Sequence, residues 1–78
     1  MKMYVISMSN DTLAGFRLGG VMGTNVQNEK QLELCLDEVL EKGEIGILIV
    51  SSDVYTFGKS HILNKMRDRK LPLIVEVD

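Results

Sequence analysis

The feature that most constrains the fold of this sequence is a strict alternation of short apolar runs with helix-like segments along its whole length. The run 45–50 is continuously apolar, as expected of a parallel strand that is covered by helices on both faces of a sheet. Shorter runs at 3–8, 21–26 and 73–77 also fit strands. The alternation predicts an α/β fold built on a parallel sheet.

Three helices are predicted between these strands. The first begins after Ser9, Asn10 and Asp11, whose side-chain oxygens can cap a helix, and it ends at Gly19 and Gly20. Pro72 is expected at the start of the last strand, because proline has no N–H to donate to a strand ladder and is tolerated at the first residue of a strand.

The second and third helices are predicted from caps and apolar spacing. The second runs from a cap at Asn28 to Gly43, and Ser51 or Ser52 caps the third. The apolar stripe of the second helix is Leu32, Cys35, Leu36, Val39 and Leu40. The buried side of the third is expected to carry Val54, Phe57, His61, Ile62 and Met66.

The order of the strands in the sheet follows from their composition. The first and third strands are the most apolar, so they are expected in the centre, and right-handed crossovers then give the order 2-1-3-4. The second strand is short and contains Gly23, which suits an edge. We therefore predict a single α/β domain over residues 1–78: a four-stranded parallel sheet with helices on both faces and a Rossmann-like or receiver-like topology.

The turn after the first strand is placed where α/β proteins bind ligands, but its residues do not fit a nucleotide site. The glycines Gly15, Gly19 and Gly20 lie inside and after the helix, too late to cradle a phosphate, and no P-loop pattern occurs. Asp11 and Asp53 are interpreted as helix-capping residues. We expect an empty crevice there, with no catalytic residue and no cofactor.

Other classes of function are also disfavoured. A net charge of −2 argues against nucleic-acid binding, and no apolar run reaches the ~18 residues of a membrane span. Cys35 is the only cysteine and His61 the only histidine, so neither a disulfide nor a His/Cys metal site is expected. The composition predicts a cytoplasmic protein that does not insert into a membrane.

Three segments of the sequence, in order, resemble the F subunit of the V-type/A-type ATP synthases. They are the acid and Gly-Phe helix at 11–21, the strand with its polar, acidic cap at 45–53, and the Leu-Pro-led strand at 71–77. The resemblance covers nearly the whole chain. It corresponds to the globular head of the family, which usually continues into a C-terminal helix, whereas this sequence stops at Asp78.

The resemblance implies a non-catalytic subunit of the rotary central stalk, peripheral to the membrane. Such a subunit would bind the coiled-coil shaft subunit (the D subunit) and help couple ATP turnover to proton or sodium transport. The alternative interpretation is a shortened receiver-like or flavodoxin-like signalling domain. Receiver chemistry needs clustered acids at two strand ends and a lysine on a fifth strand. Asp11 and Asp53 are expected at strand ends, but the sequence stops before a fifth strand can form.

The partner surface is expected at the edge formed by the second strand and the helix before it. Unprotected strand edges favour pairing with another chain, so association of the isolated protein through either edge is also expected. Gly15 is predicted to allow close packing of the first helix on the sheet, and Phe16 is interpreted as core or as a partner contact. The third helix and the strand at 73–77 remain alternative surfaces. The residues proposed for the contact are Phe16, Arg17, Val21, Met22, Gly23 and Thr24.

Overall fold

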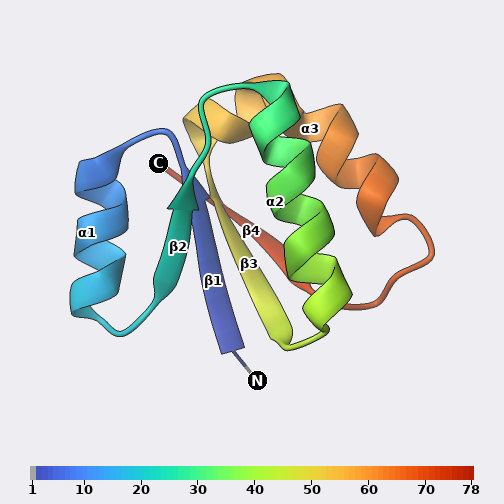
Figure 1. Ribbon diagram of the computed structural model, residues 1–78, viewed down its shortest axis with the longest axis horizontal. Helices are drawn as coiled ribbons and strands as arrows, with labels where there is room; N and C mark the ends of the chain where they lie inside the picture. Colours follow the sequence, from blue (N-terminus) through green and yellow to red (C-terminus); the bar gives the residue numbers. More distant parts are fainter. Residues whose placement is uncertain (1) are drawn as a thin grey trace.

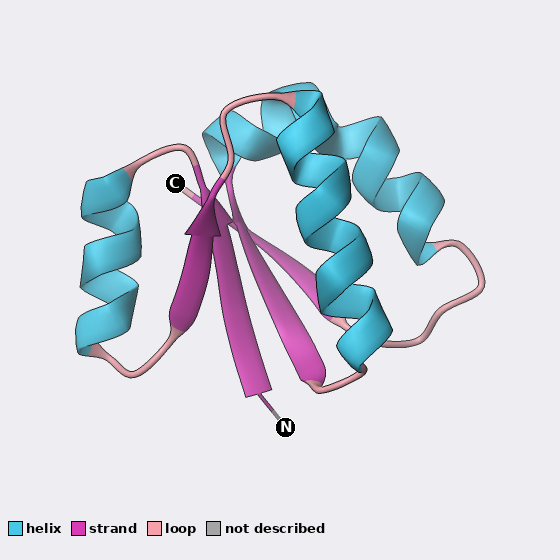
Figure 2. Cartoon of the chain, viewed as in Figure 1, coloured by secondary structure: helices cyan, strands magenta, loops and turns pink. Residues whose placement is uncertain are grey.

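The computed structural model describes residues 2–78 and shows strands and helices in strict alternation (Figures 1 and 2). The prediction of an α/β chain with four strands and three helices is confirmed, and the bounds differ from those expected by one or two residues. The elements are β1 (Lys2–Ser7), α1 (Asn10–Leu18), β2 (Met22–Asn25), α2 (Glu29–Lys42), β3 (Ile45–Ser51), α3 (Ser52–Met66) and β4 (Leu73–Val77).

All neighbouring strands are parallel, and their order is β2-β1-β3-β4, as predicted. The apolar strands β1 and β3 lie in the centre, where Val5 is paired with Ile49 and Ile6 with Val50. These side chains are almost completely buried. The short β2 and the last strand, β4, form the two edges.

Helices cover the two faces of the sheet unequally. α2 and α3 pack side by side on one face, and α1 packs on the other face over β1 and β2 (Figure 1). We call these the α2–α3 face and the α1 face. The larger buried cluster lies on the α2–α3 face and includes Leu32, Leu36 and Ile62, whereas the α1 face has a smaller cluster of Val5, Leu13 and Ile49.

The predicted caps position the helices on this sheet. The Ser9 hydroxyl accepts a hydrogen bond from the Thr12 N–H at 3.2 Å, and the Asn28 side chain accepts one from the Gln31 N–H at 2.9 Å. Gly43 ends α2 in the left-handed conformation, with φ 67°. Ser51 is the residue before α3, but its hydroxyl donates to the Asp53 carboxylate and makes no cap bond to the backbone.

The glycine that permits close packing of α1 is Gly23, and the prediction of Gly15 for this role is wrong. A Cβ atom at position 15 would have no heavy atom within 4 Å, because Gly15 faces solvent. A Cβ atom at position 23 would lie 2.4 Å from Val5 Cγ1, 2.5 Å from the Val5 carbonyl oxygen and 2.8 Å from Leu13 Cδ2. β2, β1 and α1 can therefore lie in close contact because Gly23 has no side chain.

Candidate partner-binding surface

The six residues predicted for partner contact lie on α1, on β2 and in the turn between them, but they do not form one surface. Successive side chains of a strand point to opposite faces of the sheet. Phe16 and Val21 pack against the small cluster on the α1 face, and both are partly buried. Met22 and Thr24 lie on the α2–α3 face, beside Tyr4. The predicted contact is therefore divided between two faces that meet at the β2 edge.

On the α1 face, Arg17 is the exposed member of the predicted set. It lies in the last turn of α1, where a cation is favourably placed relative to the helix dipole. The neighbouring Phe16 contributes to the core, because it packs on the cluster of Val5, Leu13 and Ile49. Within the predicted set, Arg17 is thus the most exposed residue on this side of the edge.

On the α2–α3 face, Met22 is the exposed member, with 59% of its surface accessible. It borders a cavity of about 530 Å³ between β1, β2 and the last turns of α2. Tyr4 and Val39 supply apolar walls, and the Tyr4 hydroxyl is hydrogen-bonded to Thr24. The charged residues of its lining are Lys2, Glu38, Lys42 and Glu44. Charges of both signs make this cavity a poor match for a phosphate or another strongly charged ligand.

Cys35 lies in the wall of the same cavity and is itself buried. Burial raises the pKa of its thiol above the ordinary value, and a hydrogen bond with Thr24 only partly opposes this effect. A thiol with a raised pKa is protonated at neutral pH and is a weak nucleophile. Cys35 therefore acts as a small apolar residue of the α2 stripe, as predicted from its spacing.

The carboxyl ends of β1 and β2, where a crevice was expected, are joined by amide side chains. The Asn25 amide donates to the Met8 carbonyl at 3.2 Å and to Asn10 Oδ1 at 2.8 Å. The Gln27 amide donates to the same Met8 carbonyl at 3.0 Å and also to Asn25. These bonds fasten the turn before α1 to the end of β2. Their polar groups are hydrogen-bonded within the chain.

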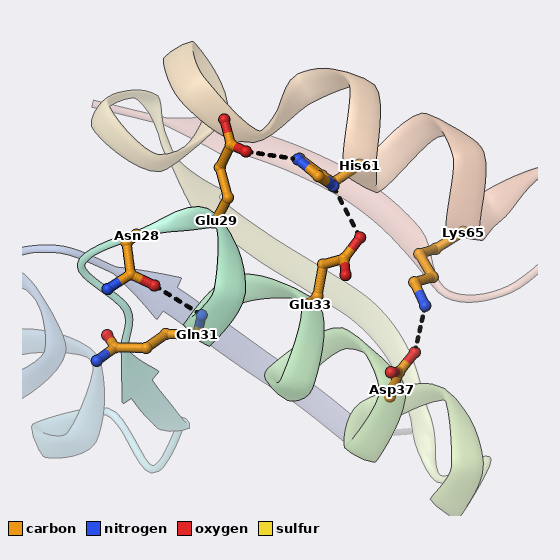
Figure 3. A network of polar contacts seen from close by, with 7 residues as sticks. All are labelled: Asn28, Glu29, Gln31, Glu33, Asp37, His61 and Lys65. Atoms are coloured by element: carbon orange, nitrogen blue, oxygen red, sulfur yellow. Dashed lines mark hydrogen bonds and ion pairs between the residues drawn. The ribbon is translucent and has the colours of Figure 1, made fainter.

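His61 was expected on the buried side of α3, and this prediction is wrong. The side chain lies between α3 and α2 and is 26% exposed. Its Nδ1 is 2.9 Å from Glu33 Oε1, and its Nε2 is 3.2 Å from Glu29 Oε2 (Figure 3). One turn further along, Lys65 pairs with Asp37. Residues four apart share one side of a helix, so these five side chains form a continuous polar seam between α2 and α3.

We expect the seam to make the stability of the protein depend on pH. The protonated His61 ring donates hydrogen bonds to the carboxylates of Glu33 and Glu29, and these bonds, with that to Glu33 having the larger effect, raise the pKa of His61 above its ordinary value of about 6.5. A raised pKa in the folded state means that folding favours the protonated ring, so the contribution is complete below about pH 6.5 and is lost as the pH rises through the folded-state pKa. We expect the difference in urea midpoint between the wild type and His61→Gln to be largest at pH 5–6 and to shrink toward pH 9.

Glu33→Gln provides the matched comparison, because it removes the carboxylate with the largest effect on the His61 pKa while keeping the shape of the side chain. In that variant the same pH-dependent difference should be smaller. A difference between wild type and His61→Gln that stays constant from pH 5 to pH 9 would contradict this account of the seam.

The acidic side chains of the described residues do not combine with His61 or Cys35 into a metal site. Within residues 2–78, no group of three or more histidine, cysteine, aspartate or glutamate side chains is arranged to hold a metal ion. Of the helices that the structure describes, none combines the length and apolar character that crossing a membrane requires. Asp11 and Asp53, the acids considered for phosphate chemistry, lie in the first turns of α1 and α3.

The fold defines the class of the protein as a small doubly wound α/β domain, and comparison with known proteins gives the family. The sequence matches the family described as ATP synthase (F/14-kDa) subunit over residues 3–78, so the chain belongs to that family. This result favours the resemblance to the ATP synthase F subunits over the receiver-like or flavodoxin-like interpretation. A comparison with curated proteins found no match.

The fold is similar to that in the crystal structure of the Archaeoglobus fulgidus F subunit of the V-type ATP synthase. The two structures superpose with a TM-score of 0.75 at 18% sequence identity. The alignment covers 99% of this chain and 96% of that chain. The likeness therefore extends over the whole α/β domain described above and supports its architecture.

Sequence reasoning missed two features of the surface. In the polar seam, the pairs His61–Glu33 and Lys65–Asp37 each join residues 28 positions apart, so no local sequence pattern predicts them. The division of the predicted contact between two faces could have been foreseen, because Val21 and Gly23 alternate with Met22 and Thr24 along one strand.

Proposed function

We propose that this chain is a non-catalytic central-stalk subunit of a V/A-type ATP synthase. In this role it binds the coiled-coil shaft subunit (the D subunit) and helps couple ATP turnover to proton or sodium transport, on the cytoplasmic side and peripheral to the membrane. The observation that carries the proposal is the match to the family of ATP synthase F subunits over residues 3–78. The site chemistry is compatible with it, because the polar groups at the strand ends bond to one another.

We place the shaft contact at the β2 edge. Arg17 and Met22 are exposed there on either side of the sheet, and the outer backbone of β2 is the edge of the ladder. A helix of the shaft that lies along this edge could contact both side chains, while the charge of Arg17 selects an acidic position on the partner. The remaining predicted residues, Phe16, Val21, Gly23 and Thr24, would shape the edge from within.

Binding to a purified coiled-coil shaft subunit tests this placement. The chain should form a one-to-one complex, and Arg17→Glu together with Met22→Asp should weaken it by at least ~2 kcal/mol if both lie near a hot spot. Both residues are exposed, so the circular dichroism spectrum should not change. Calorimetry with each single variant would show which face of the edge contributes more.

A matched control is Lys59→Glu together with Leu63→Asp, which makes similar changes at exposed positions of α3. This control should bind normally. If the control loses binding and the β2 variant does not, the contact lies on α3. If the wild-type chain does not bind the shaft subunit at all, the proposed role of this domain in shaft attachment is refuted.

A further inference from the structure

One face of β4 carries an apolar strip. Within the described residues no helix packs over this strip, whereas α1 packs over the same face of β1 and β2. Leu73 and Val75 are 56% and 43% exposed, and Val77 is partly buried. Their register places Leu73 beside Ile47 and Val75 beside Ile49, so the strip continues the α1 face across β3. Three apolar side chains thus alternate along an edge strand on its exposed face.

The topology explains why this strip is uncovered. A right-handed crossover places its helix on a face that depends on the direction of the move along the sheet. The step from β1 to β2 runs one way and places α1 on one face. The steps from β2 to β3 and from β3 to β4 run the other way and place α2 and α3 on the opposite face (Figure 1). The β3–β4 half of the α1 face is left without a crossover.

Charge is distributed unequally between the two ends of β4. Arg67, Arg69 and Lys70 precede the strand, with the single acid Asp68 among them, and Glu76 and Asp78 lie at its other end. All six side chains are exposed, and within residues 2–78 none of them takes part in an ion pair. A second β4 strand that runs antiparallel to the first would bring the basic end of each copy beside the acidic end of the other.

We propose that two copies of this chain associate through the outer edges of their β4 strands, antiparallel and related by a two-fold axis. One sheet then runs through both copies, and the free backbone groups of each edge are paired. With Val75 of one copy opposite Val75 of the other, Leu73 lies opposite Val77, and such apolar cross-strand pairs are favourable. The opposed charges at the two ends select the antiparallel direction.

The other edge is less suited to this pairing. β2 has four residues against five in β4, and its sequence includes Gly23, Thr24 and Asn25, two of which are polar. The side chains of Thr24 and Asn25 are already hydrogen-bonded within the chain. The inference does not depend on the proposed shaft contact, which lies at the opposite edge of the sheet.

Sedimentation equilibrium of the chain tests the association through its mass. At about 100 μM the wild type should contain a species of twice the 8.7 kDa chain mass. Val75→Lys should raise the dimer dissociation constant at least ~10-fold, because two like charges would face each other across the edge. Leu63→Lys, the same kind of change at an exposed site on α3, should leave the constant unchanged.

The charges give a second, independent test. Arg69→Glu with Lys70→Glu should weaken the dimer, and adding Glu76→Lys and Asp78→Lys should restore it, because the complementarity is then inverted but intact. Exchange of the β4 amide hydrogens should also slow as the protein concentration rises, which would distinguish edge pairing from contact elsewhere.

A chain that stays monomeric at about 100 μM refutes the proposal. It is also refuted if Val75→Lys and Leu63→Lys dimerise equally well. If the chain is monomeric and Val75→Lys abolishes binding to the shaft subunit, the strip binds a shaft helix. The proposal that a second copy of the chain binds there is then wrong.

Discussion

Replacing Leu36 with alanine will lower the free energy of unfolding by about 2–5 kcal/mol, because the lost contacts leave a cavity in the larger buried cluster. Leu36 is fully buried in the middle of α2, in the same cluster as Leu32, Leu48 and Ile62. The loss is a large share of the stability that a domain of this length can have. Urea unfolding at pH 7 measures it directly.

Leu34→Ala is the matched control, since it makes the same change two residues away on the same helix. Leu34 is 58% exposed, so its removal should alter the free energy of unfolding by no more than ~0.5 kcal/mol. Equal effects of the two substitutions would show that the apolar stripe of α2 does not face the core.

Gly23→Ala is expected to have the second largest effect, a loss of about 1–3 kcal/mol. The added methyl group would meet the Val5 carbonyl oxygen at 2.5 Å, and a backbone atom in a central strand cannot move aside as a flexible side chain can. We expect β2 and α1 to be displaced together. A lower urea midpoint, with shifted methyl resonances of Val5 and Leu13, would identify this displacement.

Gly15→Ala is the comparison for this experiment. The new methyl group would have nothing within 4 Å, and alanine favours a helix over glycine by roughly 0.8–1.0 kcal/mol. The variant should therefore be slightly more stable than the wild type. If position 15 proved the more sensitive of the two glycines, α1 would have to pack on the sheet through its own backbone and not through the gap at Gly23.

The contrast between these two glycines shows where the sequence was sufficient and where it was not. The strand order was predictable, because β1 and β3 are visibly richer in apolar residues than β2. The role of a glycine depends on what lies opposite the absent side chain, and this is decided by tertiary packing. The sequence predicts a packing role for Gly15 inside its helix, whereas it predicts for Gly23 an edge strand and a place in the partner contact.

The histidine illustrates the same limit. Its position in the apolar spacing of α3 predicted burial, but the ring lies at the border between the core and solvent. There it reaches carboxylates on α2, and a helical spacing cannot identify residues on another helix. The prediction treated the contact surface at β2 as one edge and did not separate the two faces to which its side chains point, although the alternation along a strand predicts that separation.

The unequal covering of the sheet has a consequence for motion. Besides the β1–β2 ladder, α1 and β2 are packed on β1 through the small cluster of Val5 and Leu13 and the close approach at Gly23, whereas α2 and α3 share the larger cluster. Segments with few buried contacts open at a lower free energy than the whole domain. We therefore expect α1 and β2 to open at a lower free energy than the rest of the sheet. A partner that binds only the closed form of this edge would make its opening less frequent. Its binding would therefore increase the stability of the folded chain.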